Sequence, residues 1–142
     1  MLGAEGTLKF VGLWRVRTPQ QRAHAATVMV VDNAPFMRTR CAELLTRSGY
    51  HVVEAASGAE ALARYEETKP DAVLMDIDMP DMDGVQALKK LVSIDPNVKV
   101  AMVTAMGQRS IVMECLRSGA KDFVLKPFDP ERVMAAVKTM LG

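Results

Sequence analysis

From Thr27 onward, the sequence alternates between short apolar runs and segments with helical periodicity. Continuous apolar runs rich in Val are typical of strands that are buried on both faces of a sheet. Residues 27–31 form such a run, and residues 71–75, 97–103 and 122–125, which are mostly apolar, are predicted as further strands. A more mixed run at residues 50–55 has the polar content of an edge strand. The pattern therefore predicts five strands.

Each expected strand is followed by a segment whose apolar residues lie on one helical face. After Pro35, this spacing links Met37, Cys41, Leu44 and Leu45. Four further helices are expected at about residues 58–67, 85–92, 108–118 and 130–141. Strands that are joined by helical crossovers must be parallel. The expected fold class is therefore α/β, a (βα)₅ doubly wound parallel sheet with helices on both faces.

Composition narrows the class of protein. The 142 residues are 49% hydrophobic and 25% charged, as expected for one globular domain, and the net charge of +1 gives no reason to expect nucleic acid as a partner. No apolar run approaches the roughly 20 residues of a membrane span, so we expect a cytoplasmic protein without membrane insertion. Cys41 and Cys115 are expected to be reduced thiols rather than a disulfide.

Residues 1–26 differ from the domain that we expect at residues 27–142. Their four basic residues outweigh a single acid, and Leu8 to Trp14 form an apolar run that Gly12 interrupts. This run is too short for a convincing signal peptide. Two interpretations stay open: an extension without a structural role, and an arm that docks Phe10 and Trp14 on the domain or on a partner.

Polar side chains follow four of the five expected strands. Asp32 follows the first strand, Asp76 the third, Thr104 the fourth and Lys126 the fifth. In open parallel sheets, the ligand site lies outside the carboxyl ends of the strands. We therefore expect these four side chains to share one site.

The chemistry of this set is that of phosphoryl transfer. Mg²⁺ takes one or two carboxylates and keeps several waters, so Asp32 and Asp76 are candidate ligands. A carboxylate can also attack a phosphoryl group to form an acyl phosphate, and Asp76 is the candidate nucleophile. The charge on the transferred group is stabilised by cations and donors, here Mg²⁺, the Lys126 ammonium and the Thr104 hydroxyl.

Asp76 opens an unusually acidic stretch that ends at Gly84. Asp81 and Asp83 are expected to be solvated loop charges or to favour the start of the next helix through its dipole. The carbonyl of Asp78 could reach a metal ion, and its side chain could line the site.

Four sequence blocks then resemble a known family. "VVDNAPFMR", "VLMDIDMPDMDG", "MVTAMG" and "AKDFVLKPF" are similar to the signature blocks of response-regulator receiver domains from two-component signalling, and most of all to the stand-alone chemotaxis regulators. The resemblance covers about residues 27–142 and implies the flavodoxin-like strand order 2-1-3-4-5.

The resemblance also implies roles for single residues. Asp76 would accept phosphate from the phosphohistidine of a sensor histidine kinase, and Asp32, Asp76 and the Asp78 carbonyl would bind Mg²⁺. Thr104 would bond the phosphoryl group, Lys126 would pair with it, and the peptide bond after Lys126 would be cis.

Two residues depart from the family's pattern. Asn33 stands where a second acid normally binds the metal directly, so it is a doubtful ligand; the Asp78 side chain could restore the missing charge. Phe123 stands at the position of the switch aromatic, which is often Tyr in chemotaxis regulators. Its ring could swing inward together with Thr104, but it has no hydroxyl for a partner.

The chain ends one residue past the last expected helix, so we expect output by binding to a partner such as a flagellar motor switch protein. Met106 and Met113 lie on or near the expected output face. Three alternatives stay open. They are a degenerate receiver that binds without phosphorylation, a phosphorelay intermediate, and a phosphatase of the haloacid-dehalogenase type.

Overall fold

The computed structural model describes residues 26–79, 83–105 and 109–142. Strands and helices alternate strictly along them. The strands are β1 (Thr27–Val31), β2 (His51–Ala55), β3 (Ala72–Asp76), β4 (Val100–Thr104) and β5 (Asp122–Leu125). The helices are α3 (Pro35–Arg47), α4 (Gly58–Thr68), α5 (Gly84–Ile94), α6 (Arg109–Arg117) and α7 (Pro130–Leu141). The expected (βα)₅ pattern is confirmed.

The five strands form one parallel sheet in the order β2-β1-β3-β4-β5, as the resemblance implied. β1 lies between β2 and β3, and Val31 pairs with both Ala55 and Met75. β2 is an edge strand whose residues are mostly exposed or half-buried, which confirms the expectation from its mixed sequence. The order places the carboxyl ends of β1, β3, β4 and β5 side by side.

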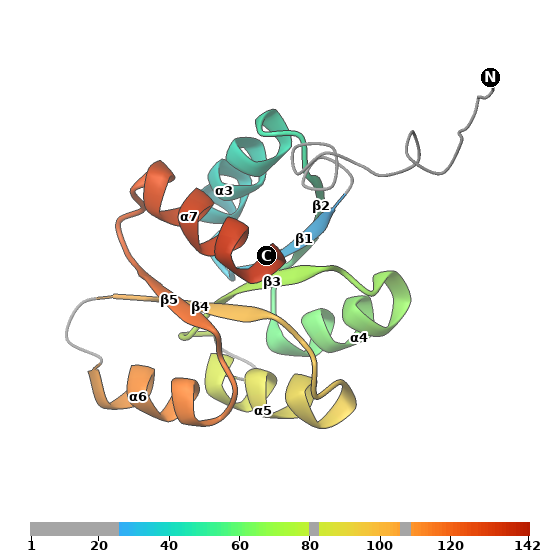
Figure 1. The fold of residues 1–142 in the computed structure, drawn as a ribbon, viewed down its shortest axis with the longest axis vertical. Coiled ribbons are helices and arrows are strands. Elements are labelled where there is room, and N and C mark those ends of the chain that lie inside the picture. The colour runs from blue at the N-terminus through green and yellow to red at the C-terminus, as the bar shows by residue number, and fades with distance from the viewer. Residues whose placement is uncertain (1–25, 80–82, 106–108) are drawn as a thin grey trace, which may run out of the picture.

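Helices cover both faces of the sheet (Figure 1), with α3 and α7 on one face and α4, α5 and α6 on the other. Alternate residues of each inner strand point to opposite faces, so Met29 and Met75 join one apolar cluster while Val28 and Leu74 join the other. Burial on both faces explains why these strands are continuously apolar.

The observed boundaries correct several expectations. β3 ends at Asp76 and β4 ends at Thr104, so both polar residues lie at strand ends as expected, whereas Asp71, expected in the third strand, precedes it. Residues 97–99, expected in the fourth strand, precede it. On α3, Met37 and Leu44 are only half-buried, and Ala42 is buried beside Cys41 instead.

Both cysteines are free and buried, as expected. Burial raises the pKa of the Cys41 thiol to about 12, with a further contribution from Asp32, so this thiol stays protonated at neutral pH. Within the part of the chain that the structure describes, no helix is long and apolar enough to cross a membrane.

Gly84 brings the start of α5 against the end of β3. Its amide donates to the Ile77 carbonyl at 2.6 Å. A Cβ at this position would overlap the backbone carbonyl of Asp76. Asp83 caps the helix by accepting from the Gln86 amide at 2.8 Å, as expected for a charge at a helix start. The backbone of the acidic segment is therefore fixed at Gly84 and Asp83.

We predict that Gly84→Ala lowers the free energy of unfolding by about 3 kcal/mol, because the added methyl meets backbone atoms that cannot turn away. Urea unfolding measures this change. Gln86→Ala, an exposed change in the same helical turn, should stay within about 0.5 kcal/mol of the wild type. Equal effects of the two substitutions would contradict the close approach.

Candidate functional site

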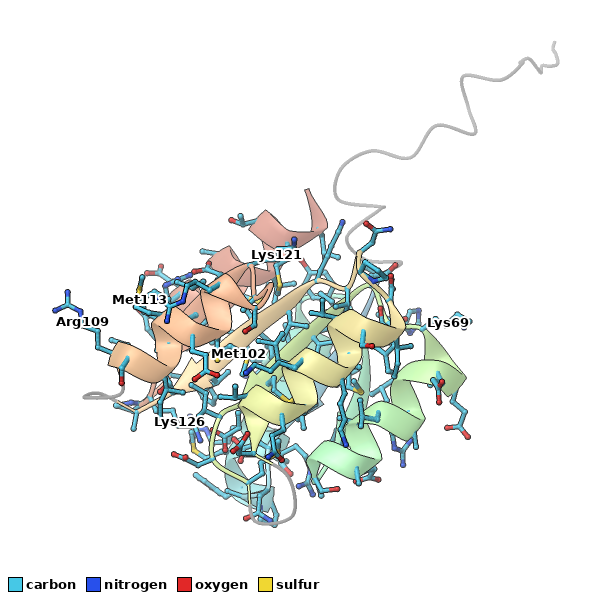
Figure 2. The ribbon with its side chains drawn as sticks, turned by 90° about the horizontal axis from the view of Figure 1, so that it is seen from below. Lys69, Met102, Arg109, Met113, Lys121 and Lys126 are labelled. Carbon is cyan, nitrogen blue, oxygen red and sulfur yellow. The ribbon has the colours of Figure 1, made fainter. Side chains whose placement is uncertain are left out.

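Four polar side chains meet at the carboxyl edge of the sheet. Asp76 ends β3 and pairs with Val103, and Thr104 is the next residue on the neighbouring strand. Asp32 follows β1 on the other side of β3, and Lys126 follows β5. Figure 2 shows Lys126 and Lys121 at opposite ends of β5.

The Lys126 ammonium lies between two carboxylates. Its Nζ is 3.1 Å from Asp76 Oδ1 and 3.4 Å from Asp32 Oδ2. Only 4% of Asp32 and 6% of Asp76 is exposed, so both carboxylates are largely shielded from water. One positive charge therefore faces two buried negative charges.

The pKa values reflect this imbalance. Burial raises the pKa of Asp76 above its usual value, the Asp32 carboxylate raises it further, and Lys126 only partly opposes them. Burial alone would lower the pKa of the Lys126 ammonium, but Asp76 and Asp32 together raise it above its usual value. Lys126 is therefore charged at neutral pH, and the site retains an excess of negative charge.

Backbone contacts hold Asp32 in place. Its amide donates to the Ala55 carbonyl at 3.1 Å, and its Oδ1 accepts from the Ala34 amide at 2.8 Å. Arg38 was not predicted as a site residue, and its Nη1 donates to the Asp32 carbonyl at 2.8 Å. Arg38 lies near the start of α3, where the helix dipole favours acidic residues. This unusual position of a cation was the feature of the sequence that could have indicated it.

The other predicted site residues occupy different environments. Asn33 is exposed, and Asp78 is exposed but close enough to raise the pKa of Asp76. The Thr104 hydroxyl is buried and donates to the Ala105 carbonyl at 3.1 Å. Phe123 is half-buried and packs against the apolar cluster beneath α6. Pro80, Asp81 and Met106 lie outside the described residues.

The profile of the response regulator receiver domain family matches residues 28–138. The chain belongs to this family. Receiver domains of this kind are phosphoacceptor signalling domains and not catalytic enzymes, so the alternative of a haloacid-dehalogenase-type phosphatase is wrong. The peptide bond between Lys126 and Pro127 is cis, as the resemblance implied.

Known proteins resemble this receiver domain over most of its length. Chemotaxis protein CheY of Thermotoga maritima is 49% identical over 111 residues, which cover 78% of this chain and 92% of that protein. Chemotaxis protein CheY of Bacillus subtilis is 45% identical over 119 residues, covering 83% of this chain and 99% of that protein. The CheX–CheY–BeF₃–Mg²⁺ complex of Borrelia burgdorferi matches with a TM-score of 0.78 and 33% identity, over 82% of this chain and 90% of that one.

Receiver domains use Mg²⁺ for phosphorylation. Among residues 26–79, 83–105 and 109–142, no three His, Cys, Asp or Glu side chains form a group that could hold a metal ion. Mg²⁺ needs fewer than three such side chains, because it binds one or two carboxylates and completes its coordination shell with carbonyl and water oxygens. The buried pair of Asp32 and Asp76, with only Lys126 against it, fits a divalent cation, and the Asp78 carbonyl would supply a third oxygen.

We predict that Asp76→Asn raises the free energy of unfolding at neutral pH in metal-free buffer. The pKa of Asp76 is higher in the folded protein than in the unfolded chain. The stability of the wild type therefore falls as the pH rises from the unfolded-state pKa to the folded-state pKa. The advantage of the variant should shrink as the pH falls below about 3.8, where the carboxyl is protonated in both states. Urea unfolding over the acid to neutral range measures it.

The control for this prediction is Glu67→Gln, which removes the same charge from an exposed position on α4. Its effect on the free energy of unfolding should be small and should not follow the pH dependence of Asp76→Asn. A gain for Asp76→Asn that is the same at every pH would contradict the assigned cause.

Proposed function

We propose that this receiver domain accepts a phosphoryl group on Asp76 in a magnesium-dependent reaction and thereby changes its binding to a partner. The observation that supports the proposal best is the Lys126 ammonium, which lies 3.1 Å from Asp76 and 3.4 Å from Asp32 at the edge of the sheet. A nucleophile, a second carboxylate and a fixed cation are the parts that phosphoryl transfer to a carboxylate needs.

In the proposed reaction, an oxygen of Asp76 attacks the phosphorus atom, and an acyl phosphate forms. The bond between phosphorus and the donor's leaving atom breaks, and that atom keeps the electron pair. Lys126 stays within reach and pairs with the phosphoryl oxygens. Bound Mg²⁺ would offset the negative charge that Asp76, Asp32 and the incoming group share.

The proposed signal leaves through β4 and β5. The Thr104 hydroxyl would turn from the Ala105 carbonyl to donate to the phosphoryl group. Phe123, on the adjacent strand and half-buried against the cluster beneath α6, would follow into the vacated space. On the neighbouring surface, Met113 is 46% exposed and Leu125 is 44% exposed. Flexible apolar side chains such as Met are suited to an interface with a partner.

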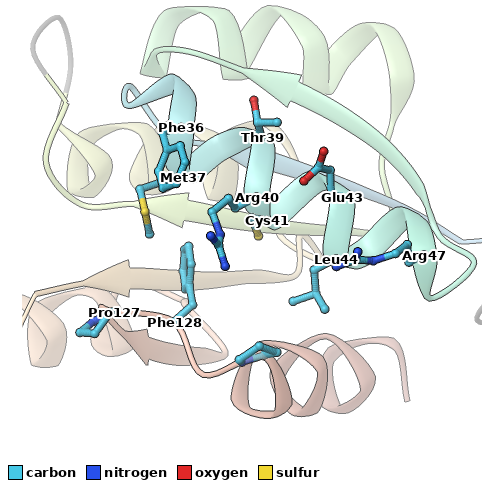
Figure 3. A pocket seen from close by; sticks show the side chains of 11 residues that line it. Phe36, Met37, Thr39, Arg40, Cys41, Glu43, Leu44, Arg47, Pro127 and Phe128 are labelled. Atoms are coloured by element: carbon cyan, nitrogen blue, oxygen red, sulfur yellow. The ribbon is translucent and has the colours of Figure 1, made fainter.

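A second surface is suited to the phosphodonor. A groove of about 700 Å³ lies between α3 and the loop after β5 (Figure 3). Phe128 reaches from this loop toward Met37 and Arg40, and Pro127 directly follows the Lys126 that contacts Asp76. We propose that a sensor histidine kinase docks here, because a protein donor must bring its phosphohistidine to Asp76.

The names of the relatives support a role in chemotaxis. We propose a flagellar motor switch protein as the downstream partner and a cytoplasmic location, as the resemblance to the family implies. The division into an extension at residues 1–26 and a receiver domain at residues 27–142 stays a prediction.

We predict that acetyl phosphate and Mg²⁺ add one phosphoryl group to the wild-type protein and none to Asp76→Asn, as measured by intact-protein mass. Glu67→Gln is the matched control, because it removes a carboxylate from an exposed position on α4, outside the site. A mass gain that persists in Asp76→Asn would overturn the proposed acceptor. No gain at any Mg²⁺ concentration would instead favour a degenerate receiver, the alternative that Asn33 raises.

We predict that Phe36→Ser lowers the rate of phosphotransfer from the cognate kinase by about tenfold, because exposed aromatic residues often dominate interface energies. Phe36 is 69% exposed, and the Arg40 guanidinium lies over its ring at 5.5 Å from the centroid. Phosphorylation by acetyl phosphate, which needs no docking, should be unchanged. Ile94→Ser, which removes an apolar side chain that is 47% exposed on α5, should affect neither rate.

A further inference from the structure

Arg38 joins the loop that carries Asp32 to the edge strand of the sheet. Its Nη1 donates to the Asp32 carbonyl at 2.8 Å, and its Nε contacts Glu54 Oε1 on β2 at 3.2 Å. The side chain of Arg38 is only 19% exposed. A largely buried guanidinium with two fixed partners is held in one geometry, because its planar fork loses little freedom on binding.

This contact acts on the peptide that links Asp32 to Asn33. The peptide unit is planar, so holding the carbonyl oxygen of Asp32 also fixes the amide of Asn33. The amide of Asp32 is already bound to the Ala55 carbonyl, and its Oδ1 accepts from the Ala34 amide. Arg38 therefore completes the set of bonds that orient the Asp32 carboxylate toward Lys126 and Asp76.

We propose that Arg38 is a positioning residue whose bridge from Asp32 to Glu54 sets the affinity of the site for divalent cations. The inference rests on the proposed function, because it concerns the metal that the phosphoryl transfer requires. Groups that orient a metal ligand typically alter affinity by about 10- to 100-fold when they are removed. With an amide at position 33, the site depends more strongly on the orientation of Asp32.

Charge and positioning predict opposite effects when Arg38 is replaced. The guanidinium is a positive charge near the proposed cation, so its removal would tighten metal binding if only electrostatics mattered. Loss of the bridge would weaken binding, because the peptide at Asp32 is no longer fixed. The sign of the change therefore separates the two roles.

The experiment titrates the unphosphorylated protein with Mn²⁺ and follows the free ion by electron paramagnetic resonance. Arg38→Met is expected to weaken Mn²⁺ binding about tenfold. Arg38→Lys keeps the charge but cannot form the planar fork to both partners, so it should also weaken binding. Arg64→Met removes a comparable Arg–Glu contact of 3.3 Å on α4 and should bind as the wild type does.

A readout without metal completes the test. Hydrogen exchange at the Ala34 amide, which donates to Asp32 Oδ1, should become faster in both Arg38 variants and stay unchanged in Arg64→Met. Tighter Mn²⁺ binding by Arg38→Met, or wild-type affinity and exchange in Arg38→Lys, would overturn the inference. If Arg38→Met does not fold, Arg38→Lys decides the question alone.

The two proposals fail in different ways. Wild-type protein that is phosphorylated on Asp76 while the Arg38 variants bind Mn²⁺ normally would overturn only the role of Arg38. Wild-type protein that binds Mn²⁺ but is never phosphorylated would overturn only the proposed function. No binding of Mn²⁺ by the wild type at any concentration would overturn both.

Discussion

The contact of one ammonium with two buried carboxylates is the interaction on which this site depends. Lys126 links segments that follow or end three different strands, through Asp32 beside β1 and Asp76 on β3. Removing charges from water is costly, and one cation cannot fully offset two anions at this depth. Burial and, after it, the Asp32 carboxylate therefore keep the pKa of Asp76 above its usual value.

The rest of the fold holds the two carboxylates close together in spite of their repulsion. The sheet order makes β1 and β3 neighbours, so their ends cannot separate without breaking a buried ladder. Gly84 lets α5 start directly against the Asp76 backbone, and Arg38 holds the peptide after Asp32. The backbones that carry both carboxylates are thus held in place. A carboxylate oxygen has two lone pairs, so oxygens that already contact Lys126 or the Ala34 amide can still bind a cation.

The sequence predicted that Asp32, Asp76 and Lys126 lie together, because parallel strands bring distant residues to one edge and a residue's place at a strand end is visible in the pattern. It predicted boundaries less well. Residues 97–99, of which only Val98 is apolar, were predicted as part of the fourth strand, but Asp95 accepts from the Asn97 amide and forms a turn there. The Arg38 bridge and the groove between α3 and Phe128 could not be predicted, because they depend on how helices and loops pack in three dimensions.

The excess of buried negative charge destabilises the folded protein, and the same excess is what favours the binding of a cation at this site. Lys126 neutralises only one of the two negative charges on Asp32 and Asp76. Further negative charge on Asp76 would be stabilised by a bound cation and by a hydrogen bond from the Thr104 hydroxyl. In the proposed function, a site that is incomplete in charge would therefore couple metal binding, phosphorylation and the movement of its neighbours.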